Sequence, residues 1–113
     1  MEAAAKMEIT NQDWKLFRRR LPDWQEAYMG QLNKEYAAIL TGEGNPSDKF
    51  WAPEKRIRQD KRCPGVPLEL RRSQLLSQLT LLLNDGVITL KDLEGFSDGV
   101  LDALHFLTER KSE

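Results

Sequence analysis

The residues of this chain that could do chemistry are few and lie apart from one another in the sequence. His105 is the only histidine, and it stands among apolar residues of a C-terminal helical pattern, where a structural role is commoner than general-base catalysis. Cys63 follows two basic residues, but no histidine or second cysteine lies near it to act as a partner base, so it is read as an incidental linker thiol. There is no P-loop, dinucleotide-binding glycine pattern or zinc-spaced Cys/His cluster. The sequence therefore predicts no catalytic residue, no enzyme activity and no cofactor.

A glycine turn, Asn84-Asp85-Gly86, invites comparison with the calcium loop of EF-hand proteins. With Gly86 as the loop glycine, Asp92 falls on the terminal carboxylate position. Leu81 and Leu83 then fall on the first and third ligand positions, where they offer no side-chain oxygen to a hard cation. The sequence therefore predicts no metal site. What remains is a hinge between two helices, in which Thr89 and Asp92 resemble a capping box.

Length and composition predict one soluble domain. Hydrophobic residues make up 40% and charged residues 31% of the 113 positions, which is ordinary for a globular protein. No apolar run approaches the roughly 20 residues that a membrane-spanning helix needs. A single cysteine and the lack of a signal-peptide pattern predict a cytoplasmic protein. Residues 1–6 match a helical spacer of the kind used in engineered fusions, and residues 7–113 are assigned to a single all-α domain.

The element that must begin this domain is a long amphipathic segment. Apolar side chains from Trp14 to Ile39 recur every three or four residues, which is the helical period. Pro22 falls within this stripe, where a proline removes one backbone donor at a cost of roughly 3 kcal/mol. We favour a break, with one helix ending near Arg20 and a second beginning with Pro22; one kinked helix is the alternative.

Three further helices follow in the expected order. A helix from about Asn45 to Arg62 should have a kinked or delayed start at Pro53. After a linker over residues 63–67, Pro67 opens a leucine-rich helix whose leucines occupy more than one face.

The last helix follows the hinge, with apolar residues at helical spacing from Leu93 to Leu107 and a break foreseen near Ser97. The predicted fold is all-α, an irregular bundle of about five helices around the central leucine-rich helix.

Surplus leucines and a row of small residues predict a surface that a partner covers. Small residues four positions apart allow close helix approach, a rule known best from membranes. We therefore rank a small, non-enzymatic protein-interaction module first, with a protein partner or a second copy as a homodimer. The candidate partner surface consists of Leu75, Leu79, Leu82, Gly95, Gly99 and Ala103.

Charge is segregated along the chain. The net charge is +3 over residues 10–22 and +4 over residues 48–72, against −3 over residues 23–44 and −4 over residues 84–113. A basic strip could follow a phosphate backbone, or its charges could be solvated and pair with the acidic helices. The isoelectric point of 5.9 lies far below the value above about 9 that is typical of nucleic-acid-binding domains, so nucleic-acid binding is the second hypothesis. The strip consists of Arg18, Arg19, Arg20, Lys55, Arg56, Arg58, Lys61, Arg62, Arg71 and Arg72.

Four segments carry a resemblance to a known family. They are Asp13-Trp14-Lys15-Leu16-Phe17-Arg18, Pro22-Asp23-Trp24-Gln25-Glu26, Lys49-Phe50-Trp51 and Leu82-Leu83-Asn84-Asp85-Gly86-Val87-Ile88-Thr89. On these motifs the chain resembles a family of short, uncharacterised bacterial proteins, over most of residues 10–109. The resemblance carries no established activity. Some members are labelled multidrug transporters, and the lack of a spanning segment in this sequence argues against that label.

Overall fold

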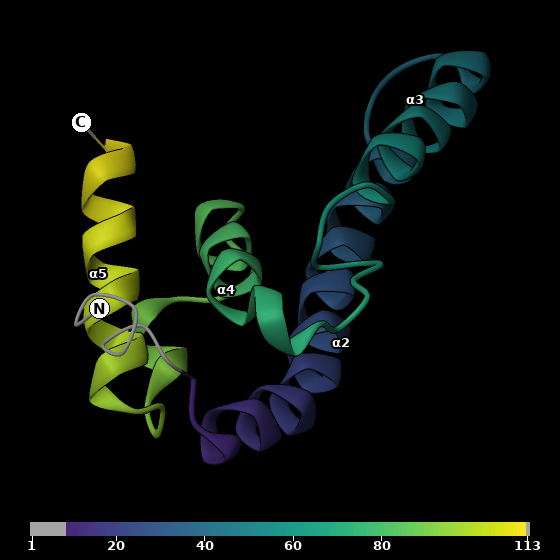
Figure 1. The fold of residues 1–113 in the computed structure, drawn as a ribbon. Helices are drawn as coiled ribbons and strands as arrows, with labels where there is room; N and C mark the ends of the chain where they lie inside the picture. The colour runs from purple at the N-terminus through teal and green to yellow at the C-terminus, as the bar shows by residue number, and fades with distance from the viewer. Residues whose placement is uncertain (1–8, 113) are drawn as a thin grey trace.

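Four α-helices and two short 3₁₀ helices build an elongated, all-helical molecule (Figure 1). The computed structural model describes residues 9–112, and the side chains of residues 9–108; the helical spacer predicted for residues 1–6 lies outside the described residues. No β-strand occurs within residues 9–112. In chain order the elements are α2 (Asn11–Thr41), α3 (Pro46–Asp60), η1 (Arg72–Gln74), α4 (Leu75–Asn84), η2 (Leu90–Leu93) and α5 (Asp98–Ser112).

Helix α2 runs unbroken through Pro22 for 31 residues, so the predicted break is wrong. Its ribbon bends in the first half instead (Figure 1). The proline ring is exposed, whereas Phe17 and Leu21 are fully buried in the core. Burial of two such side chains is worth about 2 kcal/mol each, which offsets the roughly 3 kcal/mol cost of an interior proline. The chain therefore has four α-helices in its described part, not about five.

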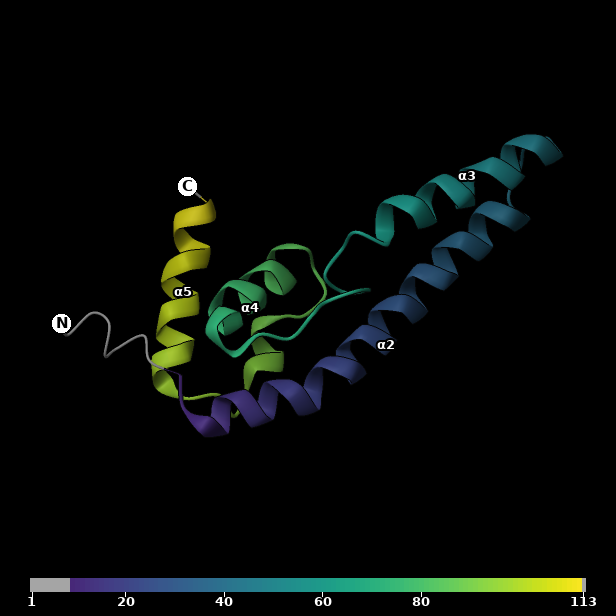
Figure 2. The same ribbon diagram turned by 45° about the vertical axis from the view of Figure 1, so that its right-hand side comes forward.

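The second half of α2 and the whole of α3 form an antiparallel pair that extends away from the other helices (Figure 2). We call this pair, residues 28–41 with α3, the arm. Helix α3 starts at Pro46 without delay and continues through Pro53, which is buried. The arm makes the molecule 60 Å long and 21 Å thick, with a radius of gyration of 17.2 Å against about 13 Å for a compact domain of this length.

The first half of α2 packs with α4, η2 and α5 in what we call the body. Its core includes Phe17 of α2, the α4 leucines, Leu93 of η2 and Leu104 of α5. The leucine-rich helix begins at Leu75 and not at Pro67. The segment before it is held as irregular backbone by the buried Gln78, whose side-chain amide donates a 2.7 Å hydrogen bond to the Glu69 carbonyl.

Helix α4 buries one face only. Leu75, Leu79 and Leu82 are fully buried, while Leu81 is half-exposed. The helix is thus one wall of the core, and its predicted central position is not confirmed.

The hinge after α4 is present as expected. Gly86 adopts φ of +77°, a left-handed conformation that glycine accepts without strain. The Thr89–Asp92 capping box is confirmed, with the Thr89 N–H donating to the Asp92 carboxylate at 2.8 Å, but it opens η2 and not the last α-helix. The chain breaks again before Asp98, close to the foreseen Ser97, and the hinge docks α5 against α4.

Candidate protein-interaction surface

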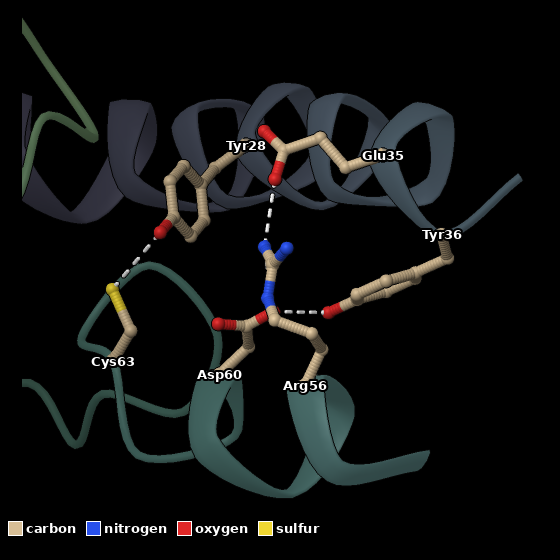
Figure 3. A network of polar contacts seen from close by, with 6 residues as sticks. All are labelled: Tyr28, Glu35, Tyr36, Arg56, Asp60 and Cys63. Carbon is tan, nitrogen blue, oxygen red and sulfur yellow. Dashed lines mark hydrogen bonds and ion pairs between the residues drawn. The ribbon is translucent and has the colours of Figure 1, made fainter. Parts of the chain in front are cut away.

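One side of the arm carries a polar network that clamps α2 to α3 (Figure 3). The Arg56 guanidinium lies 2.7 Å from the Glu35 carboxylate and 3.5 Å from that of Asp60. The Tyr36 hydroxyl donates to Asp60 at 2.6 Å, and burial together with this hydrogen bond raises the pKa of Tyr36 to about 12. Each polar group here has a partner on the facing helix, so this side fixes the register of the pair.

The linker after α3 is fastened to α2 at the root of the arm. The Cys63 thiol donates to the Tyr28 hydroxyl oxygen at 3.4 Å, and this contact, with burial, raises the pKa of Tyr28 (Figure 3). Gly65 sits so close to α2 that an added Cβ would meet the Tyr28 ring at 2.5 Å and a Val87 methyl at 2.7 Å. The Gln25 amide donates to the Val66 carbonyl at 3.2 Å. Cys63 therefore contributes a contact between the linker and α2.

The other side of the α2–α3 seam is an apolar groove made of two hollows. The base hollow, about 260 Å³, is lined by Met29 and Tyr36 of α2 and by Ile57 and Asp60 of α3, so the Tyr36–Asp60 hydrogen bond of the network lies in its wall. The tip hollow, about 480 Å³, lies between Leu40 and Phe50. Ile57 and Lys61 line both hollows, so the two form one continuous groove along the arm.

Two exposed aromatic rings lie near the start of α3, and one of them, Phe50, lines the tip hollow. Phe50 is 66% exposed and Trp51 is 60% exposed, and their rings pack edge to face with centroids 4.9 Å apart. Leu40 and Ile57 along the same groove are also exposed. Among the described helices, α2 is the one that packs extensively on α3.

Most of the predicted partner surface is buried or half-buried, and of its six residues Gly95 alone is exposed. Its three leucines, Leu75, Leu79 and Leu82, are fully buried against α2 and α5 and cannot meet a partner in this conformation. Gly95 precedes α5 with φ of +103°, so it does not extend a ridge of that helix. Gly99 is half-buried and Ala103 is buried, again within the body.

The arm residues were missed as a site although their signal was present. Phe50, Trp51 and Ile57 form a narrow apolar face on a helix that is otherwise polar. One neighbouring helix is enough to bury so narrow a face. The sequence therefore did not reveal that α2 leaves most of it exposed.

The predicted basic strip is not one surface. Arg56 contacts Glu35, which lies 16 residues or about 24 Å along α2 from Arg19, and Lys61 shares a hollow with Met29, ten residues or about 15 Å from Arg19. Arg20 donates to the Asp92 and Glu94 backbone carbonyls and lies over the Phe96 ring, so it holds η2 to α2.

Several other members of the strip already face carboxylates. Arg56 pairs with Glu35, Arg58 with Glu54 and Arg71 with Glu69. The remaining α3-side members, Lys55, Lys61, Arg62 and Arg72, are exposed.

The first turns of α2 carry a basic group that is smaller than the predicted strip. Lys15, Arg18 and Arg19 line a shallow hollow of about 320 Å³, and Arg18 also lies 5.8 Å from the Trp14 ring centroid. The structure therefore brings together only a fraction of the predicted strip.

Other candidate chemistry is not assembled in the described residues. Within residues 9–112, no three His, Cys, Asp or Glu side chains gather where they could hold a metal ion. His105 lies on an exposed part of α5. Among the helices of the described part, none has both the length and the apolar character to cross a membrane.

Comparison of the chain with models of known protein families, with characterised proteins and with solved structures finds no match. The resemblance to short bacterial proteins therefore rests on the sequence motifs alone.

Proposed function

We propose that this chain is a small, non-enzymatic protein-interaction module, and that its arm receives an amphipathic helix of a protein partner. The observation that carries this proposal is the apolar groove of the arm with Phe50 and Trp51 exposed beside it. Apolar surface that is gathered on one face of a monomer is typical of a binding site.

The energetic cost of leaving these rings in water supports a binding role. An aromatic side chain buries 150–250 Å² when covered, so the two rings together leave roughly 250 Å² exposed. At about 25 cal/mol per Å², covering them is worth about 6 kcal/mol. The body core is complete without them, since the fully buried side chains come from the first half of α2 and the segment after residue 68.

The shape of the groove indicates a helix as the ligand. From Met29 to Leu40 the groove spans eleven residues of α2, or about 16 Å, which is three helical turns. A helix that presents apolar anchors three and four residues apart would place one anchor in each hollow. The clamp through Glu35, Arg56 and Asp60 keeps the two walls of the groove at a fixed distance.

A photo-crosslinking residue at position 50 tests the proposal in the source cell. We expect a covalent protein adduct from Phe50, and none from a matched control at Leu90, which is also exposed but lies on the body. Failure to form any adduct at position 50, or equal adducts at both positions, would show that the arm is not an interaction site.

A second candidate function is nucleic-acid binding through the smaller basic group. It is favoured by one observation, that three basic side chains, Lys15, Arg18 and Arg19, are the described residues that line one hollow. Gel-shift titration at two salt concentrations tests it, because displacement of counterions makes such binding strongly salt-dependent. Replacing Arg18 and Arg19 by alanine should abolish the shift; binding that persists unchanged, or that ignores salt, would refute this candidate.

A further inference from the structure

We propose that the helix received by the arm belongs to a second copy of this chain, so that two arms pair antiparallel about a two-fold axis. This inference rests on the proposed function and names its partner. Two helix pairs laid side by side in this way form a four-helix bundle, a common solution for covering the apolar face of a helical hairpin.

The groove and the exposed ring stand at matching distances from one point of the arm. Arg56 contacts Glu35 at 2.7 Å, so the adjacent residues Ile57 of α3 and Tyr36 of α2 lie at about the same level. From that level Phe50 lies seven residues, or about 10 Å, towards the tip, and Met29 lies seven residues, or about 10 Å, towards the base. A two-fold axis at Ile57 therefore places the Phe50 ring of each copy over the base hollow of the other.

The charges on the groove rim fit the same axis. Glu54 lies three residues towards the tip from Ile57, about 4.5 Å, and Lys61 lies four residues towards the base, about 6 Å. In a two-fold interface the contact of one residue with another occurs twice. Glu54 of each copy thus faces Lys61 of the other, while Arg58 in the same helix already holds the Glu54 carboxylate at the rim.

The size of the face sets the strength of the pairing. About 14 residues of each arm helix give a face about 21 Å long and about 20 Å wide, or roughly 800 Å² for the two copies together. This lies below the roughly 1,200 Å² at which stable interfaces begin, among the weak and transient ones. We therefore expect a reversible dimer with a micromolar dissociation constant.

Sedimentation equilibrium of the purified chain, from about 5 µM to about 500 µM, tests the pairing. The average mass should rise from 13.1 kDa towards twice that value. The variant Lys61→Glu, which sets two glutamates against each other twice, should weaken the dimer at least tenfold. The double variant Glu54→Lys with Lys61→Glu restores opposite charges and should recover the wild-type constant within about threefold. Leu90→Ser on the body is the matched control and should behave as wild type.

A wild-type chain that stays monomeric throughout overturns the self-pairing, as does a double variant no better than Lys61→Glu. Equal far-UV circular dichroism of all variants shows that folding is unchanged. The two proposals fail separately. A monomeric chain whose position-50 crosslinker still captures a different protein refutes only the second copy as partner, whereas a chain with no adduct of any mass in the cell refutes the interaction module itself.

Discussion

Replacing Asp13 should cost the body much of its stability, because this carboxylate joins the starts of two helices that are distant in sequence. Asp13 is 1% exposed. Its oxygens accept hydrogen bonds from the Ser97 N–H at 2.8 Å, the Ser97 hydroxyl at 2.7 Å and the Thr10 N–H at 3.1 Å. Thr10 caps α2 and Ser97 immediately precedes α5, so one side chain fixes the angle between those helices.

The size of the loss follows from these contacts. Asp13→Ala leaves the half-buried Ser97 N–H without its acceptor, and an unmade hydrogen bond of a buried group costs about 1–3 kcal/mol. Loss of the charge-assisted bonds to the Ser97 hydroxyl and to Thr10 brings the total to about 3 kcal/mol. With a urea dependence of about 1.5 kcal/mol per M for a domain of this size, the unfolding midpoint should fall by about 2 M.

The effect should depend on pH in a defined direction. Burial acts to raise the pKa of Asp13, but the hydrogen bonds from Ser97 and Thr10 outweigh it, so the pKa lies below its ordinary 3.8. A carboxyl whose pKa is lower in the folded state stabilises the fold above the unfolded value of about 3.9 and loses that contribution as the pH falls through the folded value. The stability gap between wild type and Asp13→Asn should therefore be full at about pH 5 and shrink below about pH 3.5.

Urea unfolding followed by circular dichroism measures both effects. Asp23→Ala, an exposed aspartate of the same helix, is the control and should stay within about 0.5 kcal/mol of wild type. If the urea midpoint of Asp13→Ala is close to that of wild type, these hydrogen bonds do not contribute the stability assigned to them. If the difference in stability between wild type and Asp13→Asn is the same at both pH values, the charged form of Asp13 does not stabilise the fold.

Three further outcomes follow from the contacts at the root of the arm and at the hinge. Gly65→Ala should lower the free energy of unfolding by about 1–3 kcal/mol, because the added Cβ would overlap packed side chains. Gly30→Ala, which has open space around it and a helical backbone, should raise the free energy of unfolding by up to about 1 kcal/mol. Thermal or urea unfolding measures both changes. Gly86→Ala should cost about 1–2 kcal/mol in the same assay, because alanine resists φ of +77°. Alkaline spectrophotometric titration should find the pKa of Tyr36 near 12, and Asp60→Asn should lower it; a midpoint near 10 in the wild type would contradict the 2.6 Å hydrogen bond.

Local patterns in the sequence predict the helices well where the information is local. The three-and-four spacing of apolar residues gives α2 its length and its buried face, and the Thr89–Asp92 pair gives a cap at the right place. The fate of Pro22 is not local. Its cost is set by the backbone, but the compensating burial of Phe17 and Leu21 depends on α4 and α5, which lie more than 50 residues away.

The candidate site shows the same difference between what local sequence patterns predict and what depends on distant contacts. An amphipathic pattern tells which face of a helix is apolar and not what covers it. The α4 leucines, which the sequence patterns assign to a partner surface, are covered by α2 and α5, and the narrow apolar face of α3 is left open. The contact between Asp13 and Ser97 spans 84 positions, and no spacing rule points to it.

The length of α2 is what creates the groove. A helix of 31 residues is about 46 Å long, whereas the body core engages it only through residues near its start, from Trp14 to Trp24. Beyond that point α3 is the described helix that packs extensively on α2, and the linker after α3 packs closely against α2 at Gly65. Two helices cover each other only where they touch. Each side of that seam stays open unless another element packs on it. The Glu35–Arg56 ion pair lies on one side of the seam and the two apolar hollows on the other, and in our proposal these hollows receive the third helix.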